Sequence, residues 1–289
     1  VRFGNHSSSS AHAAAILARL EERHGRAPGM DLARAADAAR RGVFGDAERY
    51  LSSARAEAPQ DAYVGLLAGE VALQQSKLAE AEKAFASALK QGGGARAQWG
   101  LGRVALARTD QNTQRTAVEE TLKLSPLHAE ARLASARLLW NSGKQERALT
   151  ELRQALGQEP IGDQFVWSSK LAKAGSFALL GFIDESRGHL AVARKAYDEA
   201  LAADPYMVEA LLGAGRVLLR ERRWNDALAR FESALGMAQK GSASVVLSGR
   251  RADVEARLGQ SRAQLALNRA AEAKNTLVGL MKDNPNDPE

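Results

Sequence analysis

Five prolines close near-copies of one short phrase, and their spacing limits the possible folds more than any other feature of the sequence. Pro59, Pro126, Pro160, Pro205 and Pro285 follow one another in steps of 67, 34, 45 and 80 residues. These steps are mostly multiples of about 34 residues once two short insertions are allowed. A period of about 20 to 50 residues is typical of a stacked array, in which each unit buries its apolar face against its neighbours.

The phrase before the proline has the spacing of one helix face. In the clearest copy, Ala148 is followed by Leu152, Ala155 and Pro160. Residues at these spacings lie on one side of a helix, and proline ends the helix because it has no N–H. The other copies are Ala47, Leu51 and Ala54; Ala81, Phe85 and Ala88; Ala193, Tyr197 and Ala200; Ala227, Phe231 and Ala234; and Ala273, Leu277 and Leu280.

Each copy also has a front half, which predicts a second helix and a tight turn. Helix-permissive segments lie upstream at residues 34–41, 68–75, 135–140 and 179–185. Turns are predicted after them at Gly42, Ser76, Gly143 and Gly188. The repeating unit is therefore helix, tight turn, helix and break.

This pattern resembles the tetratricopeptide repeat family, whose motif runs W-x2-L-G-x2-Y, then A-x3-F, then P. The second half matches in the copies quoted above, and the first half matches in part through Gly69, Gly102, Gly181 and Gly215, with Trp99 near the tryptophan position. The resemblance implies an all-α fold, a right-handed α-solenoid of about seven helix-turn-helix units. The predicted repeats are 28–61, 62–94, 95–128, 129–162, 174–207, 208–241 and 254–287. The third departs most, with Gln114 where alanine is expected.

Two insertions and an N-terminal lead divide the predicted array. Repeats one to four span 28–162, an insertion follows at 163–173, and repeats five and six span 174–241. A second insertion spans 242–253, and repeat seven with the C-terminal end spans 254–289. Insertions at joints change the rotation between repeats, which predicts two lobes at 28–162 and 174–287. The alternative is that both insertions lengthen first helices and leave the superhelix smooth.

The lead at 1–27 combines a flexible polar stretch with a short helix. His6–Ser10 is polar, and Ile16, Leu17 and Leu20 then lie on one helical face. The helix is either the second helix of an incomplete repeat or a cap over the first one. The chain begins with Val1 rather than Met, which fits a fragment of a longer protein.

The sequence carries little that could support catalysis. There is no cysteine, and the five histidines are scattered without metal-ligand spacing. The glycines at 92–94, 100 and 102 do not follow a strand, as a phosphate-binding loop requires. The longest uncharged apolar stretch, Ala174–Ile183, is far shorter than the ~20 residues of a membrane helix. We therefore expect a protein that is not an enzyme, with no cofactor, metal, small-molecule substrate or membrane span.

The family resemblance implies that first helices present partner-binding residues at repeat positions 2, 5, 9 and 12. Position 9 holds four arginines and a phenylalanine, position 5 supplies an apolar floor and position 12 adds a tryptophan. The candidates are Arg103, Arg137, Arg216, Arg262, Phe182, Leu133, Leu212 and Trp140. Arginine donates paired hydrogen bonds to carboxylates, which favours an acidic peptide or helix as the ligand.

Ion pairing within the array is the competing interpretation of these arginines. Glu130, Glu209 and Glu255 stand seven residues before Arg137, Arg216 and Arg262, on the same predicted helix face. Exposed pairs of this kind contribute only about 0–1 kcal/mol. The arginines are therefore either ligand-binding groups or structural ones.

The sequence as a whole predicts a protein–protein interaction scaffold or adaptor. The Arg- and Ala-rich composition suggests a high-GC bacterium, and analogy with bacterial proteins of this fold suggests motility, secretion or envelope assembly. The lack of cysteine slightly favours the periplasm or cell envelope over the cytoplasm. The alternative function is nucleic-acid binding, suggested by the net charge of +6 and the pI near 9.7. The 40 basic residues are, however, interspersed with 34 acidic ones and form no basic tract.

Overall fold

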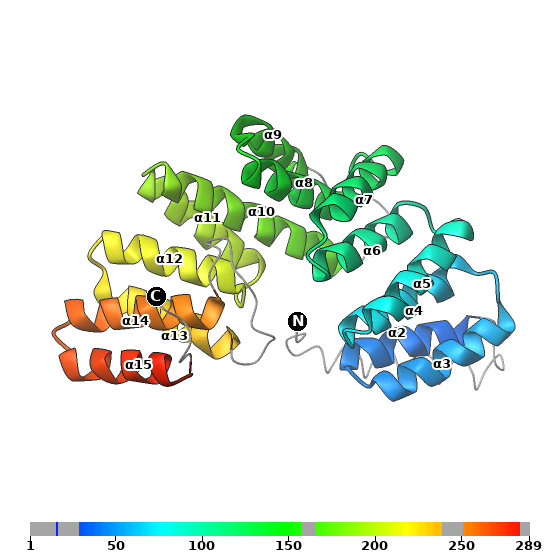
Figure 1. The fold of residues 1–289 in the computed structure, drawn as a ribbon, viewed down its shortest axis with the longest axis horizontal. Coiled ribbons are helices and arrows are strands. Elements are labelled where there is room, and N and C mark those ends of the chain that lie inside the picture. Colours follow the sequence, from blue (N-terminus) through cyan, green and yellow to red (C-terminus); the bar gives the residue numbers. More distant parts are fainter. Residues whose placement is uncertain (1–15, 17–28, 158–165, 239–250, 284–289) are drawn as a thin grey trace. The chain divides into compact units, whose positions relative to one another are not determined.

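The computed structural model of the chain describes residue 16 and residues 29–157, 166–238 and 251–283. The predicted lead, apart from residue 16, and parts of both insertions lie outside these residues. Within the described part the chain forms fourteen helices, and they follow one another in the order that the repeats predict (Figure 1).

Each predicted repeat corresponds to two successive helices. The first helices are α2 (Met30–Arg41), α4 (Ala62–Gln74), α6 (Gly94–Ala107), α8 (Ala129–Asn141), α10 (Val166–Ser186), α12 (Val208–Arg220) and α14 (Ala252–Ala266). The second helices are α3 (Phe44–Glu57), α5 (Leu78–Lys90), α7 (Gln111–Leu124), α9 (Gln145–Leu156), α11 (Leu190–Ala203), α13 (Trp224–Ala238) and α15 (Ala270–Asp283). The all-α helical-repeat fold predicted from the sequence is confirmed.

The chain divides into two compact units, residues 1–135 and 136–289, with the boundary inside α8. Within the described residues, α10 runs unbroken from Val166 to Ser186 and so includes part of the predicted insertion at 163–173. The predicted lobes at 28–162 and 174–287 stay predictions.

Tight turns join the two helices of each repeat through residues whose φ lies in the left-handed region. Gly42, Gly143 and Gly188 have φ of 75°, 75° and 80°, and Ser76 has φ of 59°. The four turns predicted from the sequence are therefore present. Thr109, Arg222 and Asn268 occupy the corresponding places in the other repeats, with a similar φ. Residues with a Cβ adopt this backbone conformation less favourably than glycine does.

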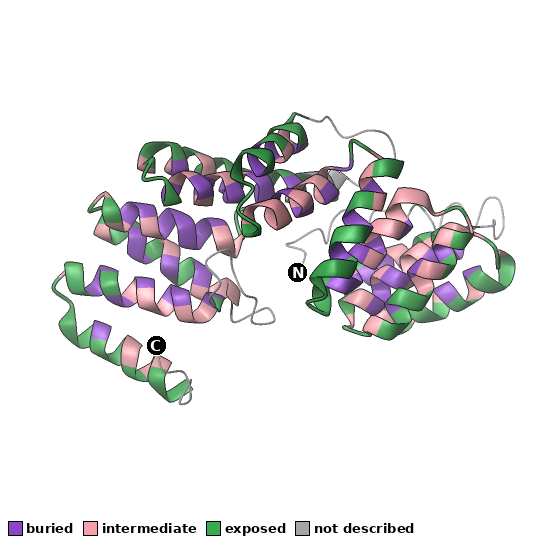
Figure 2. Cartoon of the chain, turned by 45° about the horizontal axis from the view of Figure 1, so that its top comes forward, coloured by how far each residue is buried: buried purple, intermediate pink, exposed green. Residues whose placement is uncertain are grey.

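The second helices bury the residues that defined the repeat (Figure 2). In α5, α11 and α13 the large residue is aromatic, and Phe85, Tyr197 and Phe231 are at most 1% exposed. The flanking alanines are also buried, which lets neighbouring helices approach closely. In α15 only Ala273 is buried, so the last copy of the phrase is packed less completely than the others.

Glycines on two first helices make room for each buried aromatic ring. A Cβ added at Gly215 of α12 or Gly259 of α14 would lie closer than 3.0 Å to the Phe231 ring. Gly69 and Gly100 flank Phe85 in the same way, and Gly181 and Gly213 flank Tyr197. Each ring therefore packs against its own repeat and against the next one, which couples successive repeats.

The third repeat forms its second helix despite the departure at Gln114. Asp110 caps α7 by accepting the Thr113 N–H at 3.1 Å. Gln114 is 8% exposed, and Thr121 is fully buried with its hydroxyl donating to the Ala117 carbonyl at 2.7 Å. The hydroxyl is satisfied within the helix, so a polar residue is tolerated in this core.

Candidate partner-binding surface

Two half-buried aromatic side chains meet on successive first helices of the second unit. The rings of Trp140 on α8 and Phe182 on α10 lie edge to face, with centroids 6.2 Å apart and an interplanar angle of 78°. Aromatic pairs favour this geometry because the positive edge of one ring faces the negative face of the other. The structure therefore brings together the two aromatic candidates chosen from the sequence.

Arg137 lies one turn before Trp140 on α8 and adds a polar group to this surface. Its Nε is buried, and within the part of the chain that the structure describes this atom has no hydrogen-bond partner. An unsatisfied buried donor costs roughly 1–3 kcal/mol. The side chain as a whole is half-buried, whereas the Nε atom itself is closed off from solvent.

Arg216 of α12, by contrast, is held by carboxylates from two neighbouring repeats. Its Nε and Nη2 donate to the two carboxylate oxygens of Glu185 on α10 at 2.9 and 2.6 Å, and its Nη1 donates to Glu255 on α14. The hydroxyl of Tyr197 also donates to Glu185, at 2.9 Å. These four residues form a buried charge network across three repeats.

The network perturbs the proton equilibria of its members. Burial raises the pKa of the Tyr197 hydroxyl, and the negative charge of Glu185 raises it further. Burial works to lower the pKa of the Arg216 guanidinium, but its hydrogen bonds to Glu185 and the charge of that carboxylate outweigh this, so the pKa is raised. Tyr197 therefore stays protonated and Arg216 stays charged, as a structural network requires.

The other position-9 arginines and the apolar floor are placed less uniformly than expected. Arg103 of α6 forms an ion pair with Glu70 of α4, whereas Arg262 of α14 is exposed. Leu133 of α8 is half-buried. Leu212 of α12 is fully buried in the core formed with Tyr197 and Phe231, so it cannot form part of an accessible floor.

The arginine stripe is thus divided between the two interpretations left open by the sequence. Arg103 and Arg216 pair within the array, but their partners come from neighbouring repeats and not from seven residues earlier on the same helix. Glu185 and Tyr197 were missed as members of the network. Glu185 stands at position 12 of repeat five, so the signal was present, but which helices face each other had to come from the structure.

A second aromatic contact lies in the first unit, where His128 precedes α8. Its ring is 5.6 Å from that of Trp99, and its Nδ1 accepts the Ala131 N–H at 3.3 Å. Burial lowers the pKa of His128, although the carboxylate of Glu130, 3.3 Å away, opposes this shift. A neutral His128 therefore helps to begin α8.

The described residues contain no group of three or more His, Asp or Glu side chains placed to hold a metal ion. A search of the same residues finds no helix both long and apolar enough to cross a bilayer.

Comparison with known protein families shows the family to which the chain belongs. The model of the tetratricopeptide repeat family matches residues 30–95, 66–111, 115–163 and 185–244, well over half of the sequence. The chain belongs to the tetratricopeptide repeat family, whose members are generally non-catalytic scaffolds for protein–protein interaction. No curated protein matches the full sequence significantly.

Solved structures with a similar fold include PilF, PilW and a chain of the APC/C hetero-tetramer Cut9–Hcn1. PilF of Pseudomonas aeruginosa has 16% sequence identity and a TM-score of 0.59, covering 78% of this chain and 93% of its own. PilW, described as a type IV pilus biogenesis factor, has 15% identity and a TM-score of 0.56, covering 78% and 95%.

A chain of the APC/C hetero-tetramer Cut9–Hcn1 has 13% identity and a TM-score of 0.72. The match covers 96% of this chain and 51% of that one, so the present sequence spans about half the length of that relative. At these identities the similarity establishes the fold alone.

Proposed function

We propose that this chain is a non-catalytic scaffold that docks a peptide or helix of a partner protein on the first-helix face of α8 and α10. The observation that carries the proposal is the edge-to-face pair of Trp140 and Phe182 beside the unpartnered Nε of Arg137. Tryptophan and arginine are enriched among the residues that dominate protein interfaces.

The partner segment is proposed to carry a carboxylate beside an apolar side chain. A carboxylate bound by the half-buried Arg137 side chain would form charge-assisted hydrogen bonds, which are stronger than neutral ones. The aromatic pair offers an apolar surface next to it. Arg262 is an accessible second contact, whereas Arg103 and Arg216 are excluded because carboxylates of the array already bind them.

An envelope assembly is the cellular context that we propose. Two of the similar structures are PilF and PilW, and the latter is described as a type IV pilus biogenesis factor. Their likeness to this chain supports a role in motility, secretion or envelope assembly only at the level of the fold. A periplasmic or envelope location would agree with that role.

Site-specific photo-crosslinking tests the proposed surface. A photoreactive phenylalanine analogue at position 182 should crosslink a partner in lysate of the source cells, and the same analogue at the exposed position 206 should not. Arg137→Ala or Trp140→Ala should then lower the crosslinked yield severalfold, whereas Leu106→Ala, an exposed first-helix residue of the first unit, should leave it unchanged. Equal crosslinking at 182 and 206 in a folded protein would remove the surface assignment.

Nucleic-acid binding is distinguished from binding of a protein partner by its dependence on salt concentration. Phosphate contacts weaken steeply with ionic strength, so any weak binding of single-stranded RNA or DNA should vanish by ~0.2 M salt. Sequence-selective affinity that survives this salt concentration would favour the nucleic-acid alternative over a protein partner.

A further inference from the structure

The last second helix, α15, is covered less completely than the others. Helix α13 packs against α12 of its own repeat and against α14 of the next one. Helix α15 packs against α14, and no further helix follows it within the part of the chain that the structure describes. Most residues of α15 are exposed or only half-buried (Figure 2). The face that a following first helix covers in the earlier repeats is therefore open on α15.

Two apolar side chains, Leu277 and Met281, lie on this open face. Leu277 stands four residues after Ala273, at the place of the large residue in the repeated phrase, and is half-buried. Its equivalents are at most 5% exposed: Leu51, Phe85, Val118, Leu152, Tyr197 and Phe231. Met281, four residues further on, is 71% exposed. The leucines at that place in other repeats are buried or half-buried: Leu89, Leu122, Leu156, Leu201 and Leu235.

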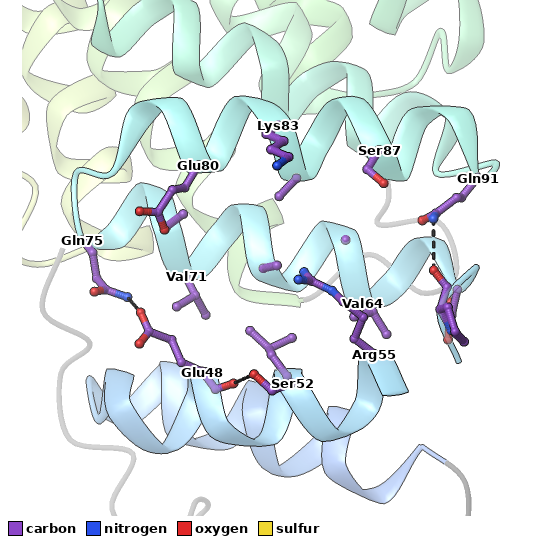
Figure 3. Close-up of a pocket in the computed structure, with 17 residues that line it drawn as sticks. Glu48, Ser52, Arg55, Val64, Val71, Gln75, Glu80, Lys83, Ser87 and Gln91 are labelled. Atoms are coloured by element: carbon purple, nitrogen blue, oxygen red, sulfur yellow. Dashed lines mark hydrogen bonds between the residues drawn. The ribbon is translucent and has the colours of Figure 1, made fainter. Parts of the chain in front are cut away.

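In the earlier repeats the following first helix covers these places with one face of its own. On α4 this face consists of Val64, Leu67 and Val71, at positions 3, 6 and 10 of the predicted repeat. Residues at these spacings lie on one side of a helix. All three belong to the core that contains Leu51 of α3, and Figure 3 shows Val64 and Val71 directed from α4 toward α3. The array thus contains an example of the helix that fits over a leucine.

The size of the residue at position 6 follows the size of the residue that it covers. Glycine stands there after each aromatic ring, and leucine stands there after each leucine of the earlier repeats. The pairs are Phe85 with Gly100, Tyr197 with Gly213, Phe231 with Gly259, Leu51 with Leu67, and Leu152 with Leu179. Close packing explains this rule, because a large residue on one side leaves little room on the other. A helix that covers Leu277 should therefore carry leucine at the matching place.

The other junctions also give the direction of the covering helix. A Cβ at Gly100 of α6 would contact the Phe85 ring of α5, and a Cβ at Gly93, seven residues earlier, would contact the later Ala88. The sequences of the two helices thus run in opposite directions along the contact. A helix on α15 would accordingly lie antiparallel to it, with its first turns toward Met281.

A second copy of this chain does not offer a matching face on α2 or α15. At position 10, α2 carries Asp37, whose carboxylate forms ion pairs with Arg40 and Arg41 at 2.7 and 3.0 Å, whereas every other first helix has an apolar residue there. If α15 of a second copy placed its Leu277 at position 6, Lys274 would stand at position 3. An ionised side chain is costly to bury in an apolar contact, so a different protein is the better occupant.

We infer that the open face of α15 binds an amphipathic helix of a partner protein, antiparallel to α15 and with leucine at the centre of its apolar face. Aliphatic residues three before and four after that leucine complete the face, as Val64 and Val71 do on α4. The inference concerns a second helix and does not rest on the surface proposed for α8 and α10.

Two designed peptides test the inference by fluorescence anisotropy. Both have roughly 14 residues, about four helical turns, with valine three places before the central residue and isoleucine four places after it. The central residue is leucine in one peptide and alanine in the other. The full chain should bind the leucine peptide at least about 10-fold more tightly, since leucine buries more apolar surface. Alanine is the better helix former, so this preference could not come from helix propensity.

Variants of α15 and α14 locate the binding site. Met281→Lys should weaken binding of the leucine peptide at least about 10-fold, because it places a charge in the apolar contact. Val278→Lys is the matched control and should leave binding unchanged. Val278 is 53% exposed, but it stands where other second helices carry exposed polar residues such as Asp198 and Glu232. Leu277→Phe combined with Ser261→Gly copies the aromatic junctions and should abolish the preference for leucine.

Four outcomes would overturn the inference. Equal affinity for the two peptides, equal loss from Met281→Lys and Val278→Lys, or no binding below ~1 mM by a chain whose circular dichroism is intact would each remove the site. A dimer in sedimentation velocity that Met281→Lys converts to a monomer would assign the face to a second copy. Trp140→Ala should bind the leucine peptide normally, so this test and that of the proposed function fail independently.

Discussion

Replacing Arg216 with methionine should strongly destabilise the second unit, because two buried carboxylates would lose their hydrogen bonds to its guanidinium. The side chains of Glu185 and Glu255 are only 6% and 8% exposed. Methionine preserves much of the apolar stem of arginine but removes every donor. Glu185 would keep the hydrogen bond from Tyr197 at 2.9 Å and the guanidinium of Arg220 at 4.0 Å. Glu255 would lose its bond to Arg216.

The expected cost follows from the burial of the pair. Removing one partner of a buried ion pair costs about 3–5 kcal/mol. We expect about 3 kcal/mol, the lower end, because Tyr197 and Arg220 still contact Glu185. Arg103→Met provides a matched control, since it also breaks an ion pair between first helices. The side chains of Arg103 and Glu70 are 35% and 34% exposed, so this change should cost about 0–1 kcal/mol.

Hydrogen exchange is the suitable assay because repeat arrays can unfold in more than one step. Amides of α12 should exchange roughly 100-fold faster in Arg216→Met than in the wild type, which corresponds to about 3 kcal/mol. A loss below about 1 kcal/mol, or one equal to that of Arg103→Met, would refute the buried-network explanation.

Two further predictions concern close packing and pH. Gly259→Ala should lower the stability of the second unit by about 1–3 kcal/mol because its Cβ would overlap the Phe231 ring. Gly236→Ala, whose Cβ would have nothing within 4 Å, should raise the stability by about 0.5–1 kcal/mol. Urea midpoints that shift in the same direction for both variants would contradict this prediction. Burial lowers the pKa of His128, so the unfolded chain takes up the proton first and stability should fall as the pH drops below about 6.5. His128→Asn keeps an acceptor for Ala131 and should lose less stability between pH 7.5 and 5; parallel urea-midpoint curves would show that His128 does not contribute.

Most of the fold could be predicted because residues close in the sequence, at fixed spacings, define the repeat. The positions of Phe85 and Phe231 relative to their alanines define one helix face, and both rings are fully or almost fully buried. Gly100 and Gly213 could have been recognised as well, since they recur six places into their predicted repeats.

The candidate site was less predictable because its contacts join different repeats. The sequence left Arg216 open between binding a ligand and pairing along its own helix, but the packing of α12 between α10 and α14 presents Glu185 and Glu255 to it.

The glycine pairs around the buried rings also bear on how such an array could evolve. Phe231 needs Gly215 in its own repeat and Gly259 in the next. A recombination that exchanges whole repeats would separate the ring from Gly259, and one that cuts between the two helices of a repeat would separate it from Gly215. Neither exchange is neutral at this junction, so duplication or shuffling should be tolerated more readily where the second helix carries leucine, as at Leu51 and Leu152.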